Sequence, residues 1–199
     1  MIWLVAIILL LALWLVFRAK GPAPKAVLIV SLFLVVILAA LFWSRAPSGR
    51  MPEGAWLQAD KRETIDLSGS FETLDGKAVS LEELKGKPLF LNVWATWCGP
   101  CRLEMPSMAE LYREMSPRGL QMIAVTDEDA ETVRAFLARN RYPFTVLLDP
   151  ENTLSSRFNI SAIPTTFIVD DEGRLAYRHV GFNQWNSPQV RQEIGKLLP

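Results

Sequence analysis

The stretch Pro88–Arg102, PLFLNVWATWCGPCR, joins an apolar run directly to two cysteines that are three positions apart. Its first half is rich in Leu, Val and Phe and predicts a strand buried on both faces of a sheet. A helix is predicted to follow, from roughly Gly99 to Met115, and Pro100 suits its first turn because a missing N–H is harmless there. Cys98 is therefore expected where a strand ends and a helix begins.

Cys98 and Cys101 are the only cysteines in the sequence. Unpaired N–H groups and the positive end of the helix dipole favour an anion at a helix N-terminus, so we expect a lowered pKa for the Cys98 thiol. Cys98 is then expected to be exposed and to attack disulfides, and Cys101 to resolve the mixed disulfide. A disulfide that merely staples the fold is the alternative, but closing so short a loop contributes only roughly 2 kcal/mol.

The composition excludes several other classes of site. Two cysteines and one distant histidine, His179, are too few for a closed zinc site, so we expect no metal and no cofactor beyond a redox-active Cys98–Cys101 disulfide. Lys and Arg balance Asp and Glu, 21 against 21, so no basic surface for nucleic acid is predicted. His179 is expected to be a half-buried strand residue and not a catalytic base.

The pattern of apolar residues and turns predicts an α/β domain. Asp75-Gly76 lies between two short β-prone runs, as in a hairpin, and Asp170-Asp171-Glu172-Gly173 separates two later strands. The expected elements are a hairpin over 70–80, strands over 88–95, 120–126, 165–169 and 175–180, and helices over 99–115, 130–140 and 190–198. This order predicts a central mixed sheet flanked by helices, with ligand chemistry at the carboxyl ends of its parallel strands.

The first quarter of the chain contains two uncharged apolar runs, residues 1–17 and 26–43, and each is predicted to be a transmembrane helix. The connector, residues 18–25, carries three basic residues and no acid, so the positive-inside rule makes it a cytoplasmic loop. Everything after residue 43 is then expected outside the cytoplasm. A cleaved signal peptide and a buried helical hairpin are the alternatives.

Residues 44–64 are rich in Pro, Gly, Ser and charge and show no persistent period, so a linker is predicted there. Residues 65–199 are expected to form one domain of ordinary size. The predicted location is the inner membrane of a bacterium, with the lipid bilayer as one partner and the domain on the periplasmic, or extracytoplasmic, side.

The segments WATWCGPCRLEMP (94–106) and IPTTFIVDDEGRL (163–175) resemble the TlpA/ResA-like branch of the thioredoxin superfamily, and the similarity extends over about residues 65–182. The resemblance implies a thioredoxin-like fold and an enzyme that exchanges thiols and disulfides. It also implies a cis-proline at Pro164, with Ile163 and Thr165 pairing with the substrate backbone. An ordinary trans proline at the start of an edge strand is the alternative.

Glu104 follows Cys101 by three residues, so the two share a helix face. In the resembled branch a glutamate at this spacing tunes the cysteine pKa values, and Asn92 occupies the strand position where cytoplasmic thioredoxins carry a buried acid. A solvated glutamate is the alternative. Trp97 is expected to form part of a docking surface, whereas core packing explains Trp94 more simply. The acidic run 127–131 is expected to cap the next helix.

Gly99-Pro100, between the cysteines, contains no histidine that would stabilise a thiolate, which favours a reductant. The resemblance implies a DsbD/CcdA-type membrane electron donor and oxidised protein substrates such as apocytochrome c. Three alternatives stay open: a disulfide oxidase or isomerase of the same fold, a thiol peroxidase, and a non-catalytic assembly module. The Pro and Thr pattern of peroxiredoxins is absent before Cys98.

Overall fold

The computed structural model describes residues 35–36 and 54–199, and the chain divides into two units, Met1–Arg50 and Met51–Pro199. Among the residues described, no helix combines the length and apolar character that crossing a membrane requires. Apart from Val35 and Val36, the two predicted membrane segments and the loop between them lie outside the described residues.

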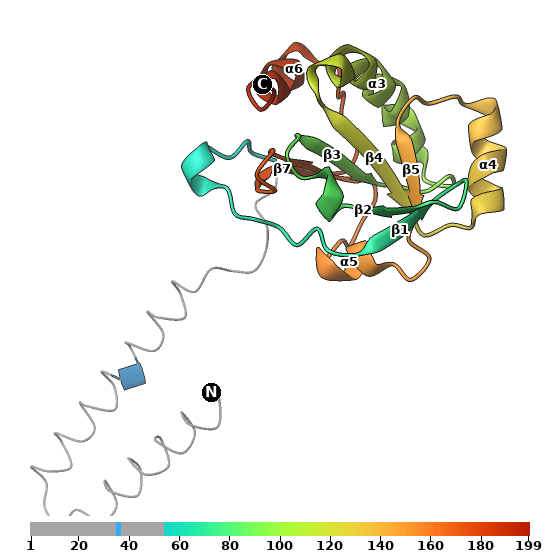
Figure 1. Cartoon of the computed structure of the whole chain (residues 1–199), viewed down its shortest axis with the longest axis horizontal. Coiled ribbons are helices and arrows are strands. Elements are labelled where there is room, and N and C mark those ends of the chain that lie inside the picture. The colour runs from blue at the N-terminus through green and yellow to red at the C-terminus, as the bar shows by residue number, and fades with distance from the viewer. Residues whose placement is uncertain (1–34, 37–53) are drawn as a thin grey trace, which may run out of the picture. The chain divides into compact units, whose positions relative to one another are not determined.

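The second unit is built on one seven-stranded sheet with the order β2-β1-β5-β4-β3-β6-β7 (Figure 1). Its strands are β1 (Ser70–Thr73), β2 (Ala78–Ser80), β3 (Leu89–Val93), β4 (Gln121–Thr126), β5 (Thr145–Leu148), β6 (Thr165–Val169) and β7 (Leu175–Val180). The central β3, β4 and β5 are parallel, and the flanking strands pair antiparallel. The predicted mixed sheet is confirmed.

Alternation along the strands divides the core between the two faces of the sheet. The helices are α3 (Gly99–Met115), α4 (Ala130–Arg139), α5 (Thr153–Arg157) and α6 (Pro188–Gly195), with 3-10 turns η1 (Ala59–Lys61), η2 (Glu82–Leu84) and η3 (Ser116–Arg118). Buried residues of α3, α4 and α6 share one cluster with Phe90, whereas Leu154 of α5 belongs to the other with Leu89 and Leu91. Figure 1 shows α3 and α6 on one side of the sheet and α5 on the other.

Two elements were not predicted, β5 and α5. β5 follows Pro143, and its four residues are too few to show a period. α5 spans only Thr153–Arg157, which is likewise too short for a helical period. Their omission matters because β5 lies inside the sheet, between β1 and β4.

The compact unit begins before residue 65, the boundary expected from the sequence. Gly54 and Leu57 donate backbone hydrogen bonds to Arg178 and Ala176 of β7, both at 2.8 Å. Trp56 stacks on Tyr177, with ring centroids 4.6 Å apart. The second half of the predicted linker therefore lies along the outer edge of β7, because an otherwise unpaired strand edge offers it backbone partners.

Candidate functional site

The two cysteines form a disulfide at the start of α3, at the carboxyl end of β3. The S–S distance is 2.01 Å and the Cα atoms are 5.3 Å apart. Cys98 is the N-cap residue of α3, and its Sγ accepts a hydrogen bond from the backbone N–H of Cys101 at 3.2 Å. Pro100 lies in the first helical turn, as predicted. The sulfur of Cys98 thus occupies the position where a helix N-terminus stabilises negative charge.

The prediction that Cys98 is exposed is wrong for this disulfide form. Cys98 is only 4% exposed and Cys101 is fully buried, and both belong to the cluster beneath α3. The carbonyl oxygen of Ile163 lies 3.7 Å from Cys98 Sγ, and the Ile163 side chain packs against the same cluster. The loop before β6 therefore covers the sulfur, a contact between residues 65 positions apart that local sequence does not reveal.

The Ile163–Pro164 peptide bond is cis, so the alternative of a trans proline is wrong. The sheet register explains why this bond lies at the disulfide. Val93, the last residue of β3, pairs with Thr165, the first residue of β6, in an antiparallel ladder. The residue before β6 and the segment after β3 must then be neighbours. The Pro164 carbonyl accepts a hydrogen bond from Gly181 N–H at 2.8 Å, which ties the turn to the segment after β7.

Glu104 is fully buried on α3, and the alternative of a solvated side chain is wrong. Its Oε1 accepts a hydrogen bond from Asn92 Nδ2 at 2.8 Å. Its Oε2 accepts from Trp185 Nε1 at 3.0 Å and from the backbone N–H of Asn183 at 3.2 Å. Burial raises the pKa of the Glu104 carboxyl to about 7, although the three hydrogen bonds oppose the shift. A carboxyl with this pKa can accept and return a proton near neutral pH.

Asn92 lies on β3 and connects Glu104 to the neighbouring strand. Its Nδ2 also donates to Thr166 Oγ1 at 2.8 Å, while its Oδ1 is buried without a hydrogen-bond partner among the described residues. A neutral amide therefore occupies the strand position where, by the family resemblance, cytoplasmic thioredoxins carry a buried acid. The buried carboxyl group beside the cysteines is instead that of Glu104, on α3.

Large apolar side chains are exposed around the disulfide. Trp97 precedes Cys98 and is 71% exposed, Leu103 in the first turns of α3 is 71% exposed, and Phe182 after β7 is 48% exposed. A cavity of about 430 Å³ opens beside Trp97 and is lined in part by Trp97, Asp127 and Ile163. Trp94, by contrast, is 1% exposed, as expected for a core residue. Trp97 is therefore exposed as the docking prediction requires, whereas Trp94 is part of the core.

The predicted capping role of the acidic run 127–131 is confirmed for Asp129, which accepts a hydrogen bond from Thr132 N–H at the start of α4. Glu128 has a different role that was not predicted. Its carboxylate accepts from the backbone N–H and the hydroxyl of Thr96, at 2.5 and 2.6 Å. It thereby fixes the loop that presents Cys98. His179 is half-buried on β7, as expected, and lies edge-on to Trp185.

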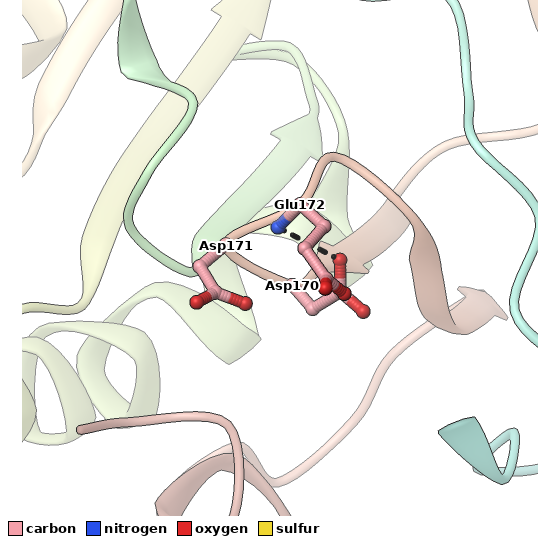
Figure 2. Close-up of side chains that lie close together, drawn as sticks. All are labelled: Asp170, Asp171 and Glu172. Atoms are coloured by element: carbon pink, nitrogen blue, oxygen red, sulfur yellow. Dashed lines mark hydrogen bonds between the residues drawn. The ribbon is translucent and has the colours of Figure 1, made fainter.

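A second acidic group, Asp170, Asp171 and Glu172, lies in the turn between β6 and β7 (Figure 2). Asp170 is 3% exposed, and its carboxylate accepts from Arg62 Nη1 at 3.2 Å, Arg174 Nε at 3.0 Å, and the backbone N–H groups of Glu172 and Arg174. Four donors and two guanidinium charges already satisfy this carboxylate. The group is therefore organised as a salt-bridged turn.

The sequence did not point to Trp185 or Asn183, and it did not indicate the role of Glu128. Each reaches the site across 32 to 81 positions of sequence. Asn-Gln-Trp-Asn after β7 gives no periodic or motif signal, and only the fold shows that it lies against α3.

A helix-capping disulfide next to a cis-proline, on a mixed sheet of this order, defines a thioredoxin-fold thiol-disulfide oxidoreductase. The comparisons with known proteins agree. The model of the AhpC/TSA family matches residues 61–178. ResA, a thiol-disulfide oxidoreductase of Bacillus thuringiensis, is 32% identical over 171 residues, which cover 84% of this chain and 96% of ResA. The thioredoxin-like protein YneN of Bacillus subtilis is 40% identical, over 56% of this chain and 67% of YneN.

Solved structures show the same likeness. A thiol:disulfide interchange protein of the thioredoxin family from Chlorobium tepidum is 32% identical, has a TM-score of 0.58, and matches 69% of this chain and 100% of its own. DsbF, in a structure with mixed oxidised and reduced forms, is 26% identical with a TM-score of 0.58, over 67% of this chain and 99% of its own. The chain belongs to the ResA-like thiol-disulfide oxidoreductases, within the AhpC/TSA family.

Proposed function

We propose that this oxidoreductase is anchored in the inner membrane of a bacterium and reduces disulfides of proteins outside the cytoplasm. The observation that carries the proposal is the triad of a helix-capping Cys98, a neighbouring Cys101 and a buried Glu104 on the same helix. The uncharged runs 1–17 and 26–43, separated by a basic loop, support the anchor and its orientation. Apocytochrome c is the proposed substrate.

The reaction begins with the reduced Cys98–Cys101 pair. The Cys98 thiolate attacks one sulfur of the substrate disulfide, the S–S bond breaks, and the departing substrate thiolate takes up a proton. Cys98 is now joined to the substrate by a mixed disulfide. One substrate sulfur is now a thiol and the other is still held in the mixed disulfide, so the two-electron reduction of the substrate is half complete.

Resolution completes the transfer. The Cys101 thiol gives its proton to Glu104, and the resulting thiolate attacks Cys98 Sγ, which forms the Cys98–Cys101 disulfide and releases the second substrate thiolate. The proton passes from Glu104 to that thiolate. In total, two electrons and two protons leave the dithiol, and the substrate disulfide becomes two thiols. A carboxyl with a pKa of about 7 suits a group that must both accept and return this proton.

Substrate docking is assigned to the backbone of Ile163 and Thr165 beside Pro164, and to the exposed Trp97. The carbonyl of Ile163 already lies 3.7 Å from Cys98 Sγ, so a peptide paired with this segment has its own sulfur close to the attacking one. The cavity beside Trp97 and the apolar Leu103 and Phe182 add surface for residues that flank the substrate cysteine. Gly99 and Pro100 separate the two sulfurs and shape the turn.

The oxidised enzyme must be reduced again before each cycle. A DsbD/CcdA-type membrane carrier is the proposed electron donor, since a domain outside the cytoplasm is separated from the cytoplasmic pool of reductants. We expect the reduction potential of the full-length chain to lie closer to the roughly −270 mV of thioredoxin than to the roughly −120 mV of DsbA. A potential near that of DsbA would instead assign the chain as an oxidase or isomerase.

A trapping experiment tests the mechanism. Cys101→Ala in the full-length chain should accumulate mixed disulfides with substrates, visible on non-reducing gels and removed by dithiothreitol. The matched control, Cys98→Ala, keeps one thiol but should form no such adducts. Absence of adducts for Cys101→Ala in membranes of cells that make substrate would contradict the proposed order of attack.

Two further measurements separate the alternatives. A thiol peroxidase would consume hydrogen peroxide at a rate that depends on Cys98, whereas the proposed reductase should not. A non-catalytic assembly module would still support growth or cytochrome maturation after Cys98→Ser with Cys101→Ser. If the chain is the proposed reductase, this double variant should support neither.

A further inference from the structure

The Glu104 carboxylate is held unequally at its two oxygens. Oε2 receives two donors, Trp185 Nε1 at 3.0 Å and the Asn183 backbone N–H at 3.2 Å. Oε1 receives one, Asn92 Nδ2 at 2.8 Å. Each carboxylate oxygen has two lone pairs, so Oε2 is filled and Oε1 keeps one lone pair open. A proton that arrives without displacing a donor therefore binds Oε1.

Trp185 is fixed by contacts on several sides. It is fully buried, and its ring meets Phe90 of β3 edge-on, with centroids 4.8 Å apart. Its backbone N–H donates to Ser107 Oγ at 3.1 Å, and the Ser107 hydroxyl donates to the Glu104 carbonyl at 2.7 Å. The same turn of α3 thus holds both the backbone of Trp185 and the carboxyl that its indole contacts. The indole has little freedom to leave Oε2.

The titratable groups around this carboxyl are few among the described residues. Cys101 lies one turn earlier on α3, and His179 and Tyr177 of β7 pack against the far side of Trp185, at 5.9 and 6.3 Å between ring centroids. No charged group contributes to the raised pKa of Glu104, which comes from burial and is opposed only by hydrogen bonds. Burial is therefore the main cause of the raised pKa, and the three neutral donors are the groups that offset it.

We propose that Trp185 is a positioning residue: with the Asn183 N–H it fills Oε2 of Glu104, so that Oε1 alone receives and returns the proton of Cys101. The proposal rests on the proposed proton transfer between Cys101 and Glu104. It adds that the segment after β7, which contains no cysteine, determines which oxygen of Glu104 holds that proton.

The first test uses the full-length chain without substitution in this segment. In ¹⁵N-labelled oxidised protein, the Trp185 indole and Asn183 amide resonances should both titrate with a midpoint at the Glu104 pKa, about 7. Both shifts should vanish in Glu104→Gln. Because both donors stay on Oε2 when Oε1 is protonated, both peaks should persist below the midpoint. Absence of titration, or loss of both peaks below the midpoint, would overturn the proposal.

The second test compares two tryptophan variants. Trp185→Phe removes an indole N–H that stabilises the ionised carboxylate, whereas Trp94→Phe removes a buried indole N–H that has no partner among the described residues. Both lose similar volume from the same cluster. In Trp185→Phe, the midpoint of the pH dependence of peptide-disulfide reduction should rise by roughly one pH unit, because the charged form has lost a donor. In Trp94→Phe the midpoint should not move.

The outcomes distinguish the proton transfer between Cys101 and Glu104 from the positioning role of Trp185. If Glu104→Gln leaves the wild-type pH midpoint in place, the proposed proton transfer is wrong. If Glu104→Gln removes the midpoint but Trp185→Phe and Trp94→Phe share the wild-type value, the proton transfer stands and the positioning role of Trp185 is overturned.

Discussion

Two buried carboxylates lie in different parts of the same domain, and their partners differ in charge. Asp170 lies at the β6–β7 turn (Figure 2). It is held by the guanidinium groups of Arg62 and Arg174 together with two backbone N–H groups. Glu104, beside the disulfide, is held by three neutral donors. The carboxylate paired with cations ties two arginine-bearing segments together, whereas burial raises the pKa of Glu104 to about 7, where a carboxyl can change its protonation state.

The largest change in the free energy of unfolding is expected from Asp170→Asn. The substitution removes the carboxylate that pairs with Arg62 and one of the two that pair with Arg174, whose other partner is Glu172. Removing one partner of a buried ion pair destabilises by about 4 kcal/mol. Urea unfolding measures the loss, and Asp171→Asn at the exposed neighbouring position is the matched control. The remaining folded protein should still reduce a peptide disulfide. An unfolding midpoint equal to that of wild type would mean that the two arginines are satisfied without this carboxylate.

Glu104→Gln, in contrast, is expected to increase the free energy of unfolding. The pKa of Glu104 is raised from 4.5 to about 7 in the folded chain, so the fold prefers the neutral carboxyl and wild-type stability falls as pH rises through this range. Glutamine removes that fall. The variant should gain about 3 kcal/mol relative to wild type above pH 7, and the gain should shrink towards pH 4.5.

Unfolding curves of the oxidised protein at several pH values measure this gain. Glu131→Gln, at an exposed position of α4, is the control and should show no such trend. A constant difference between Glu104→Gln and wild type across the range would show that Glu104 does not change protonation there, and would remove the contrast with Asp170.

The smallest effect is expected from Thr166→Val. This nearly isosteric change deprives Asn92 Nδ2 of one of its two acceptors, which should cost about 1 kcal/mol. Thr145→Val, at an exposed position of β5, is the control. Equal stability of Thr166→Val and wild type would mean that Glu104 alone is enough to hold the Asn92 amide.

Several elements were predictable because their sequence signals are local. The apolar run of β3, the proline in the first turn of α3 and the Asp-Gly turn between β1 and β2 each specify their own backbone, and Gly76 has the positive φ of 79° that such a turn requires. The cis bond at Pro164 came from family resemblance and not from spacing. β5 was missed because four residues carry too little pattern.

The chemistry around the sulfurs was less predictable, because it depends on contacts between distant segments. Glu104 was expected near the thiols from its three-residue spacing, but its burial depends on Trp185 and Asn183. The cover over Cys98 comes from Ile163. The contrast between Glu104 and Asp170 is likewise invisible in sequence, since Arg62 is 108 positions from its partner.

Residues 54–65, laid along β7, also bear on how copies of this domain meet. A long, bare sheet edge is a template on which a second molecule can add a strand. Here one border of the sheet is occupied by the chain's own Gly54, Leu57 and Ile65, and the other is β2, only three residues long. Both edges of the sheet therefore leave little backbone free for a strand from a neighbouring molecule, which should limit strand exchange and fibril growth.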